Sequence, residues 1–228
     1  MSAPKRKQQS SRPGWVIPVV IIAVLGAIAM GVVIATVVSV SISSTTSTTG
    51  GKQHIEVADV VTVTGTPLPP LPQSGSDPAI GKVAPTLTGQ SFDTSAVTVP
   101  GNGPAIVAFV AHWCPHCQRE IPIITRLRYG GDWPGNVALF GVSTAVAPDR
   151  GNYPPSAWLT SVGFKAPVLV DTKDGTAADA YGLTGFPFIT WIDANGKVVL
   201  RTAGEIPEAT FNRMVQELAA GKTPTYNG

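Results

Sequence analysis

The two cysteines of this 228-residue chain, Cys114 and Cys117, lie in the stretch WCPHC, with a proline and a histidine between them. Two thiols at this spacing could form a structural disulfide, bind a metal, attach a haem or serve as a redox centre. Haem attachment requires a histidine directly after the second cysteine, and Gln118 stands there. A disulfide that closes so short a loop gains little from restricting the unfolded chain. Haem attachment is therefore excluded, and a structural disulfide is disfavoured.

A metal site is disfavoured by the number of ligands. A structural zinc site needs about four ligands, and beside the two thiols the chain has three histidines, His54, His112 and His116. His112 is near enough in sequence to be a ligand, but no second pair of ligands accompanies it. The sequence therefore predicts no metal and no cofactor other than a redox-active Cys114–Cys117 disulfide.

The residues around the cysteines predict how they are held. Residues 104–111, PAIVAFVA, form a continuous apolar run, which is typical of a strand buried on both faces. A helix is expected to begin near Cys114, so that its unpaired N–H groups and the positive end of its dipole favour the thiolate. Cys117 would follow one turn later as the resolving thiol. Pro115 suits a first helical turn, and His116 would add positive charge or a hydrogen-bond donor beside the thiolate.

The rest of the chain alternates between strand-like and helix-like patterns. Buried strands are expected at residues 136–144 and in APVLVD, and helices in PPSAWLTSVG and GTAADAYGL. The stretch FPFITWIDANGKVVLRTAG breaks at Asn195-Gly196, which indicates a hairpin, and PTLTGQSF with AVTV suggests another hairpin earlier in the chain. An amphipathic helix that ends at Gly221 closes the sequence. The expected fold class is α/β, with a mixed central sheet flanked by helices.

The first 40 residues have a different composition. Residues 1–14 contain four basic residues and no acidic one, and residues 15–40 contain no charged residue. A run of this length can cross the ~30 Å hydrocarbon layer as a helix. An uncleaved signal-anchor is favoured over a cleaved signal peptide, whose apolar core is usually about 7 to 15 residues long. The basic residues before the run predict a cytoplasmic N-terminus and an extracytoplasmic remainder of the chain.

The remainder divides into a linker and a domain. Residues 41–78 are rich in Ser, Thr and Pro and are expected to be a linker, although HIEVADVVTVTG within them could form a short strand or dock onto the domain. Residues 79–228 are the predicted domain. Beyond the first twelve residues, the remaining 12 basic residues are outnumbered by the 14 acidic ones, so no nucleic-acid surface is expected.

Three separated stretches resemble one known family, in the same order along the chain. FVAHWCPHCQREIP, with IGKVAPTLTGQSFD before it and YGLTGFPFITWIDANGKVV after it, resembles the thioredoxin superfamily. The branch it resembles contains the membrane-anchored, extracytoplasmic TlpA/ResA-type thiol-disulfide oxidoreductases. The resemblance covers roughly residues 79–220 and implies a thioredoxin-like fold. It also implies that Pro187 is the superfamily's cis-proline, which faces the cysteines and presents backbone groups to a substrate strand.

The family pattern implies further site residues. Thioredoxins often carry a buried aspartate six residues before the first cysteine, and that position is Ala108 here. Glu120 matches an acidic residue of the ResA-type branch and could take the proton of the resolving thiol instead; the alternative is a solvated residue at the start of the helix. Trp113, Pro115 and Phe186 are the expected substrate-binding residues. Simple packing is the alternative for Trp113, and Phe186 is unusual at its position.

The predicted function is that of an extracytoplasmic thiol-disulfide oxidoreductase. The CPHC sequence is the one seen in DsbA-type oxidases and favours disulfide formation or isomerisation in exported proteins, because a stabilised thiolate makes the disulfide a better oxidant. A membrane redox partner would recycle the cysteines. The main alternative is a membrane-anchored reductase of extracytoplasmic thiols such as apocytochrome c. A copper-binding or pure interaction module is less favoured, because copper chaperones of this fold normally use a wider CxxxC and a distant histidine.

Overall fold

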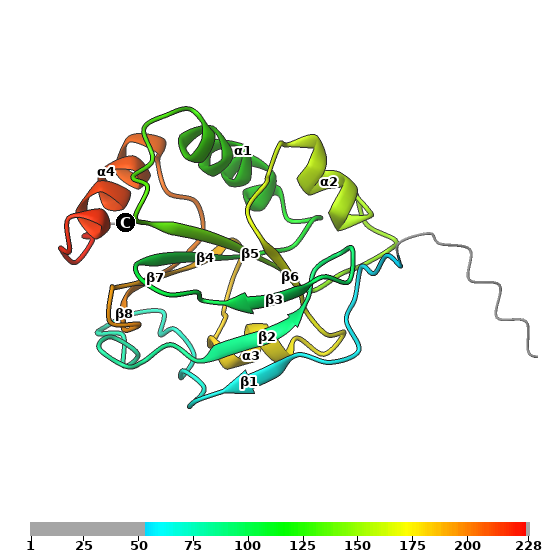
Figure 1. Ribbon diagram of the computed structural model, residues 1–228, viewed down its shortest axis with the longest axis horizontal. Helices are drawn as coiled ribbons and strands as arrows, with labels where there is room; N and C mark the ends of the chain where they lie inside the picture. The colour runs from blue at the N-terminus through cyan, green and yellow to red at the C-terminus, as the bar shows by residue number, and fades with distance from the viewer. Residues whose placement is uncertain (1–52, 227–228) are drawn as a thin grey trace, which may run out of the picture. The chain divides into compact units, whose positions relative to one another are not determined.

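The computed structural model describes residues 53–226, and their centre is a five-stranded sheet with the strand order β6-β5-β4-β7-β8 (Figure 1). The strands are β4 (Ala105–Val110), β5 (Ala138–Ser143), β6 (Val168–Val170), β7 (Phe188–Ile192) and β8 (Val198–Ala203). β4, β5 and β6 are parallel, whereas β7 runs antiparallel to both β4 and β8. The mixed sheet expected from the sequence is therefore confirmed.

β4 is buried along its whole length because its alternate side chains enter two different cores. Ile106 and Val110 pack in the core that includes residues of α1, α2 and α4, whereas Val107 and Phe109 pack in the core that includes α3 and the second sheet. The helices are α1 (Pro115–Tyr129), α2 (Pro155–Ser161), α3 (Thr176–Ala180) and α4 (Glu208–Ala219). Figure 1 shows α1, α2 and α4 on one face of the sheet and α3 on the other.

The boundaries of α1 follow from its sequence. Cys114 is the N-cap, with an extended backbone, and Pro115 occupies the first helical position, where its missing N–H is not needed. Ile121 and Ile124 recur at helical spacing and are buried in the core below the helix. Gly130 is the C-cap. The first turn of α1 is thereby placed at the carboxyl end of β4, where the predicted redox motif begins.

A second sheet of three antiparallel strands lies on the face of the central sheet that carries α3 (Figure 1). Its strands are β1 (Thr62–Thr64), β2 (Thr86–Gln90) and β3 (Ala96–Val99). The early hairpin expected from the sequence is confirmed as β2 and β3. Strand β1 lies inside residues 41–78 and confirms the expected alternative that HIEVADVVTVTG, within the predicted linker, forms a short strand.

The predicted boundary between linker and domain at residue 79 is corrected over residues 53–78. Ala58 and Leu68 are buried in the second core, and the Leu68 N–H donates to the carbonyl of Ala180 at 2.9 Å. Asp77 forms an ion pair with Arg201, whose side chain is fully buried. The linker prediction fails over residues 53–78 because the β-branched run in this segment forms a strand and because Leu68 and Asp77 make tertiary contacts. This segment is therefore part of the domain.

The predicted basic tail, the transmembrane helix at 15–40 and the start of the linker lie outside the described residues. Among residues 53–226, no helix is both long enough and apolar enough to cross a membrane. The membrane anchor therefore stays a prediction.

Candidate active site

Cys114 lies at the N-terminal end of α1, directly after the loop that follows β4. Its N–H donates to the carbonyl of Ala111 at 3.0 Å, and its carbonyl accepts the N–H of Gln118 at 3.0 Å. The second of these bonds is the first hydrogen bond of the helix. The positive end of the α1 dipole is therefore at Cys114, where it favours a thiolate over a thiol.

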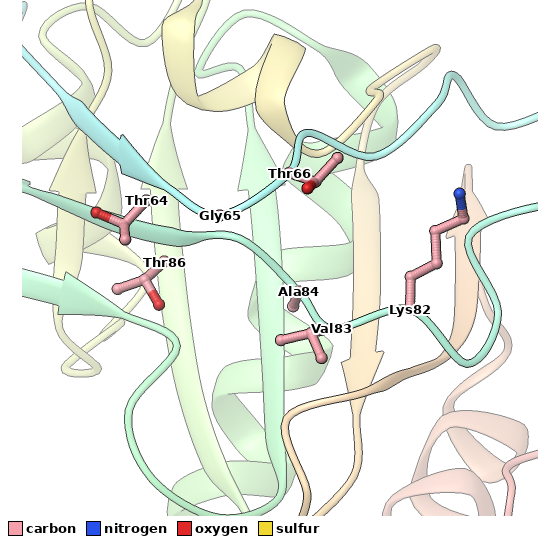
Figure 2. A pocket seen from close by; sticks show the side chains of 7 residues that line it. All are labelled: Thr64, Gly65, Thr66, Lys82, Val83, Ala84 and Thr86. Carbon is pink, nitrogen blue, oxygen red and sulfur yellow. The ribbon is translucent and has the colours of Figure 1, made fainter.

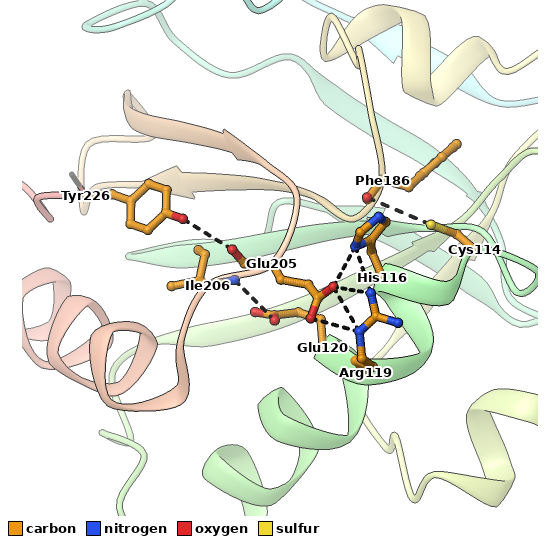
Figure 3. Close-up of polar contacts among 8 residues, drawn as sticks. All are labelled: Cys114, His116, Arg119, Glu120, Phe186, Glu205, Ile206 and Tyr226. Atoms are coloured by element: carbon orange, nitrogen blue, oxygen red, sulfur yellow. Dashed lines mark hydrogen bonds and ion pairs between the residues drawn. The ribbon is translucent and has the colours of Figure 1, made fainter. Parts of the chain in front are cut away.

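The loop before β7 faces Cys114. The Phe186–Pro187 peptide bond is cis, as the family resemblance implied, and the Sγ of Cys114 lies 3.9 Å from the carbonyl oxygen of Phe186 (Figure 3). These residues are 72 positions apart in sequence, and they meet because β7 is the neighbour of β4 in the sheet. Cys114 is only 6% exposed, and its sulfur faces the proline loop.

Cys117 lies one turn further along α1 and is completely buried. Burial raises the pKa of its thiol far above the usual range; a backbone hydrogen bond at Ala111 lowers it, and Cys114 and Glu120 raise it further. Both cysteines are free thiols in this structure. An attack by Cys117 on a mixed disulfide therefore needs a base that takes its proton.

Glu120 is in position to be that base. It follows Cys117 by three residues, which places both side chains on the same side of α1, and it is completely buried. Its Oε2 accepts the N–H of Ile206 at 3.2 Å, and its Oε1 has no hydrogen-bond partner among the described residues. Burial raises the pKa of Glu120 to about 7, against the Ile206 hydrogen bond and with a further contribution from Glu205. The alternative of a solvated residue is therefore wrong.

His116 and Arg119 extend from the first two turns of α1 to Glu205, in the loop between β8 and α4 (Figure 3). His116 Nδ1 lies 2.5 Å from Glu205 Oε1. Arg119 donates from Nε to both carboxylate oxygens, at 3.0 and 3.1 Å, and from Nη2 to Oε1 at 2.5 Å. The hydrogen bonds from Arg119 and His116 lower the pKa of Glu205 to about 2. Glu205 is thus a direct partner of the His116 ring, and the expected role of His116 beside the thiolate stays a prediction.

The three predicted substrate-binding residues lie next to Cys114 in sequence or face it across the site. Pro115 is exposed, Trp113 and Phe186 are half-buried, and the two aromatic rings meet edge to face with their centroids 5.9 Å apart. Trp113 Nε1 donates to the carbonyl of Ala145 at 2.8 Å. The guanidinium of Arg150 stacks on the Trp113 ring, 3.9 Å from its centroid. Trp113 is therefore packed on its neighbours and also partly open to a substrate.

His112 holds the loop that follows β5. Its ring is buried, and Nε2 accepts the N–H of Ala147 at 3.1 Å, so Nδ1 carries the proton and donates to the carbonyl of Gly151 at 2.8 Å. Both ring nitrogens are occupied, which contradicts the possibility that His112 is a metal ligand. Within residues 53–226, no cluster of three or more His, Cys, Asp or Glu side chains is arranged to bind a metal.

Glu205, Arg119 and Arg150 belong to this site, although the sequence did not predict them. Glu205 lies 89 residues from His116 and 86 from Arg119, so no local spacing connects it to the cysteines. Arg119 follows His116 by three positions on the same helix. That spacing is the one local signal that could have indicated Arg119.

Surface grooves are also found away from the cysteine pair in the described residues, and two of them are defined by their lining residues. The first, of about 600 Å³, is lined by residues from the end of β1, the start of β2 and the turn between 82 and 84, and it contains none of the site residues (Figure 2). The second, of about 700 Å³, is lined in part by Thr184 and Ala203. Neither of these two grooves is lined by Cys114, Cys117, Phe186 or Pro187.

A comparison with protein families agrees with this geometry. Residues 71–218, which are more than half of the chain, match the family described as Redoxin. The chain belongs to the Redoxin family. The matched range includes the cysteines, Glu120, Pro187 and Glu205. The resemblance to the thioredoxin superfamily is therefore confirmed, and the predicted enzyme class of thiol-disulfide oxidoreductase agrees with this Redoxin membership.

Individual relatives show how far the similarity extends. The thiol:disulfide interchange protein HelX of Rhodobacter capsulatus is 25% identical over 116 residues, which are 51% of this chain and 61% of HelX. The chain thus spans less than two thirds of that relative.

Two solved structures share the fold. A hypothetical protein from Sinorhizobium meliloti 1021 has a TM-score of 0.55 at 17% identity, covering 68% of this chain and 90% of that one. The solution structure of a candidate protein disulfide isomerase from Bacteroides thetaiotaomicron has a TM-score of 0.50 at 25% identity, covering 62% and 90%. Together with the family, these structures confirm the predicted thioredoxin-like fold.

Proposed function

We propose that the chain is an extracytoplasmic thiol-disulfide oxidoreductase that forms or isomerises disulfides in exported proteins. The observation that carries the proposal is the position of Cys114 at the N-cap of α1, with its sulfur 3.9 Å from the Phe186 carbonyl and with Cys117 buried one turn behind it. Membership of the Redoxin family supports the same chemistry. The name of HelX, a thiol:disulfide interchange protein, supports it as well.

Disulfide formation requires two exchange steps. A substrate thiolate attacks the Sγ of Cys114 in the Cys114–Cys117 disulfide; a bond forms between the substrate and Cys114, and Cys117 leaves as a thiolate that takes a proton. A second substrate thiolate then attacks the substrate sulfur of this mixed disulfide and releases Cys114 as a thiolate. The substrate loses two electrons and the domain gains them. A membrane redox partner would then reoxidise the cysteine pair.

The reductive direction is the second candidate, and Glu120 favours it. In that direction the Cys114 thiolate attacks a substrate disulfide, and Cys117 must lose its proton before it can attack the mixed disulfide. Glu120, with a pKa of about 7, is suited to accept that proton near neutral pH. The contact between His116 and Glu205 also weakens the expected stabilisation of the Cys114 thiolate. Disulfide formation remains the favoured direction, because the positive end of the α1 dipole acts on Cys114 directly.

The reduction potential of the full chain in detergent distinguishes the two directions. Equilibration with reduced and oxidised glutathione, followed by alkylation of free thiols, gives the fraction of reduced protein. A potential between about −120 and −200 mV is expected for disulfide formation or isomerisation. A potential below about −250 mV would overturn that direction and assign the chain to the reductases.

The extracytoplasmic location is proposed from the uncharged run at 15–40 and the basic residues before it. A phosphatase that folds only outside the cytoplasm is fused after Gly228 in the full chain. We expect the fusion to be active in intact cells and to sediment with membranes. An inactive phosphatase, with a fluorescent protein active at the same position, would place the domain in the cytoplasm and refute this part of the proposal.

A further inference from the structure

Two similar ion pairs connect α1 to the segment around the start of α4. Arg119 pairs with Glu205, and Arg126 pairs with Glu208, donating from Nε and Nη2 at 3.1 and 2.6 Å. The two arginines are seven residues apart, which is about two helical turns. The side chains of both pairs are partly exposed. The pairs therefore match in chemistry and setting, and they differ in their distance along α1 from Cys114.

The loop that carries Glu205 also reaches the buried side of the site. The N–H of the next residue, Ile206, donates to Glu120 at 3.2 Å, and the Glu205 carbonyl accepts the hydroxyl of Tyr226 at 3.2 Å. Figure 3 shows the Glu205 carboxylate pointing to His116 and Arg119, with Glu120 beside it. One short loop thus contacts His116 and Arg119 on α1 and also the buried carboxylate of Glu120.

We propose that Glu205 is a positioning residue of the redox centre: its carboxylate holds His116 and Arg119 and compensates the charge of Arg119, and thereby sets how strongly the Cys114 thiolate is stabilised. The inference rests on the proposed thiol-disulfide exchange and applies in either direction. The reduced protein can carry a thiolate at Cys114, whereas the disulfide carries no charge. A cation near this sulfur therefore stabilises the reduced form, and a carboxylate that neutralises the cation reduces that effect.

The electrostatics of the neighbouring groups agree with this proposal. The hydrogen bond to Glu205 is the main cause that raises the pKa of Arg119, and the charge of Cys114 contributes as well. The guanidinium is therefore within electrostatic range of the sulfur. Arg119 keeps its charge at every pH at which proteins are stable. Loss of the Glu205 carboxylate would leave this cation uncompensated, while a Gln side chain keeps nearly the same shape.

The test measures the glutathione equilibrium of the full chain and of two single variants. Glu205→Gln is expected to shift the equilibrium constant about tenfold toward the reduced protein, equivalent to about 30 mV for this two-electron couple. Glu208→Gln is the matched control, because it removes the charge from the other α1 ion pair; a shift of less than about twofold is expected, since Glu208 lies further from Cys114. Alkylation of Cys114 as a function of pH should show the same order of thiolate stability.

A double variant tests whether the effect passes through Arg119. Arg119→Gln with Glu205→Gln removes the cation and its counter-charge together, so the equilibrium should return to within about threefold of the wild type. A Glu205→Gln shift no larger than that of Glu208→Gln would overturn the proposal, as would a double variant that keeps the full tenfold shift. A wild-type chain that does not exchange with glutathione at all would instead refute the proposed function.

Discussion

Glu120 is a buried carboxyl one turn beyond Cys117 on α1. The strand position at which thioredoxins often carry a buried aspartate is Ala108, which has no acidic group. Because burial raises its pKa to about 7, the folded domain binds this proton more tightly than the unfolded chain does. Glu120 therefore contributes stability that is fully present at low pH and is lost as the pH rises through about 7. A buried acid that destabilises the fold above neutral pH is better explained by a role in proton transfer than by a role in packing.

Replacement of Glu120 by Gln should separate catalysis from stability. We expect the attack of Cys117 on a mixed disulfide to slow by about 100-fold at pH 8, because the buried thiol loses its proton acceptor. The same variant should be at least as stable as the wild type at pH 8, because it carries no buried charge. Stopped-flow release of a chromogenic thiol from the Cys114 mixed disulfide measures the rate, and urea unfolding measures the stability. A rate that stays within twofold of the wild type would exclude Glu120 as the base.

The residues of the site differ in how far the sequence could predict them. Cys114, Cys117 and Glu120 share one helix, so their spacing predicts their arrangement, and Pro187 follows from a motif resemblance. Glu205 and the Arg119 contact to it depend on how the β8–α4 loop packs against α1. Such a contact leaves no period or motif in a single sequence.

At the scale of elements, strong local patterns predicted the structure well. The apolar run at 104–111 became β4, and the helix expected after it became α1. Residues 53–78 were the main exception, because β1 has only three residues and the Pro-rich part is held by tertiary bonds. Leu71 illustrates this: its N–H donates to the carbonyl of Gly182 at 3.0 Å. A composition typical of linkers can therefore hide a segment that packs on the domain.

Asp77→Asn tests how much this segment contributes to the domain. Burial alone would raise the pKa of Asp77, but hydrogen bonds from Arg201 and from the Ala79 N–H, with the Arg201 charge, lower it overall. The pair therefore stabilises the fold above the unfolded pKa of Asp, and this contribution is lost as the pH falls through the lower folded value. We expect the variant to lose about 3 kcal/mol of unfolding free energy at pH 7, because the Arg201 charge stays buried.

Urea unfolding at pH 7 and at pH 3 measures this effect. The difference between Asp77→Asn and the wild type should shrink at pH 3, because Asp77 of the unfolded chain is largely protonated below its usual pKa and the folded state then gains less from the ion pair. Glu208→Gln serves as a comparison for an exposed ion pair, whose loss is expected to cost much less unfolding free energy than the loss of the Asp77 carboxylate. Equal costs for the two variants would show that residues 53–78 are not held by the Asp77 contact.

At the scale of the whole molecule, the sequence predicted the fold class and family, and a comparison with known families confirmed both. These follow from motifs in a fixed order and from alternating strand and helix patterns. The direction of electron flow depends on the balance of charge around Cys114, which is assembled from distant parts of the chain. The CPHC motif alone is therefore an incomplete guide to that direction, because Glu205 acts on His116 from outside it.

The position of Arg201 in the chain determines when its contacts can form during synthesis. Its guanidinium binds Asp77, and it donates to the carbonyls of Pro69 and Tyr181 at 2.8 Å. Asp77 leaves the ribosome 124 residues before Arg201 does. During synthesis, the contact between Asp77 and Arg201 can therefore form only after nearly all of the domain has been made, and a nascent chain released before Arg201 would lack it.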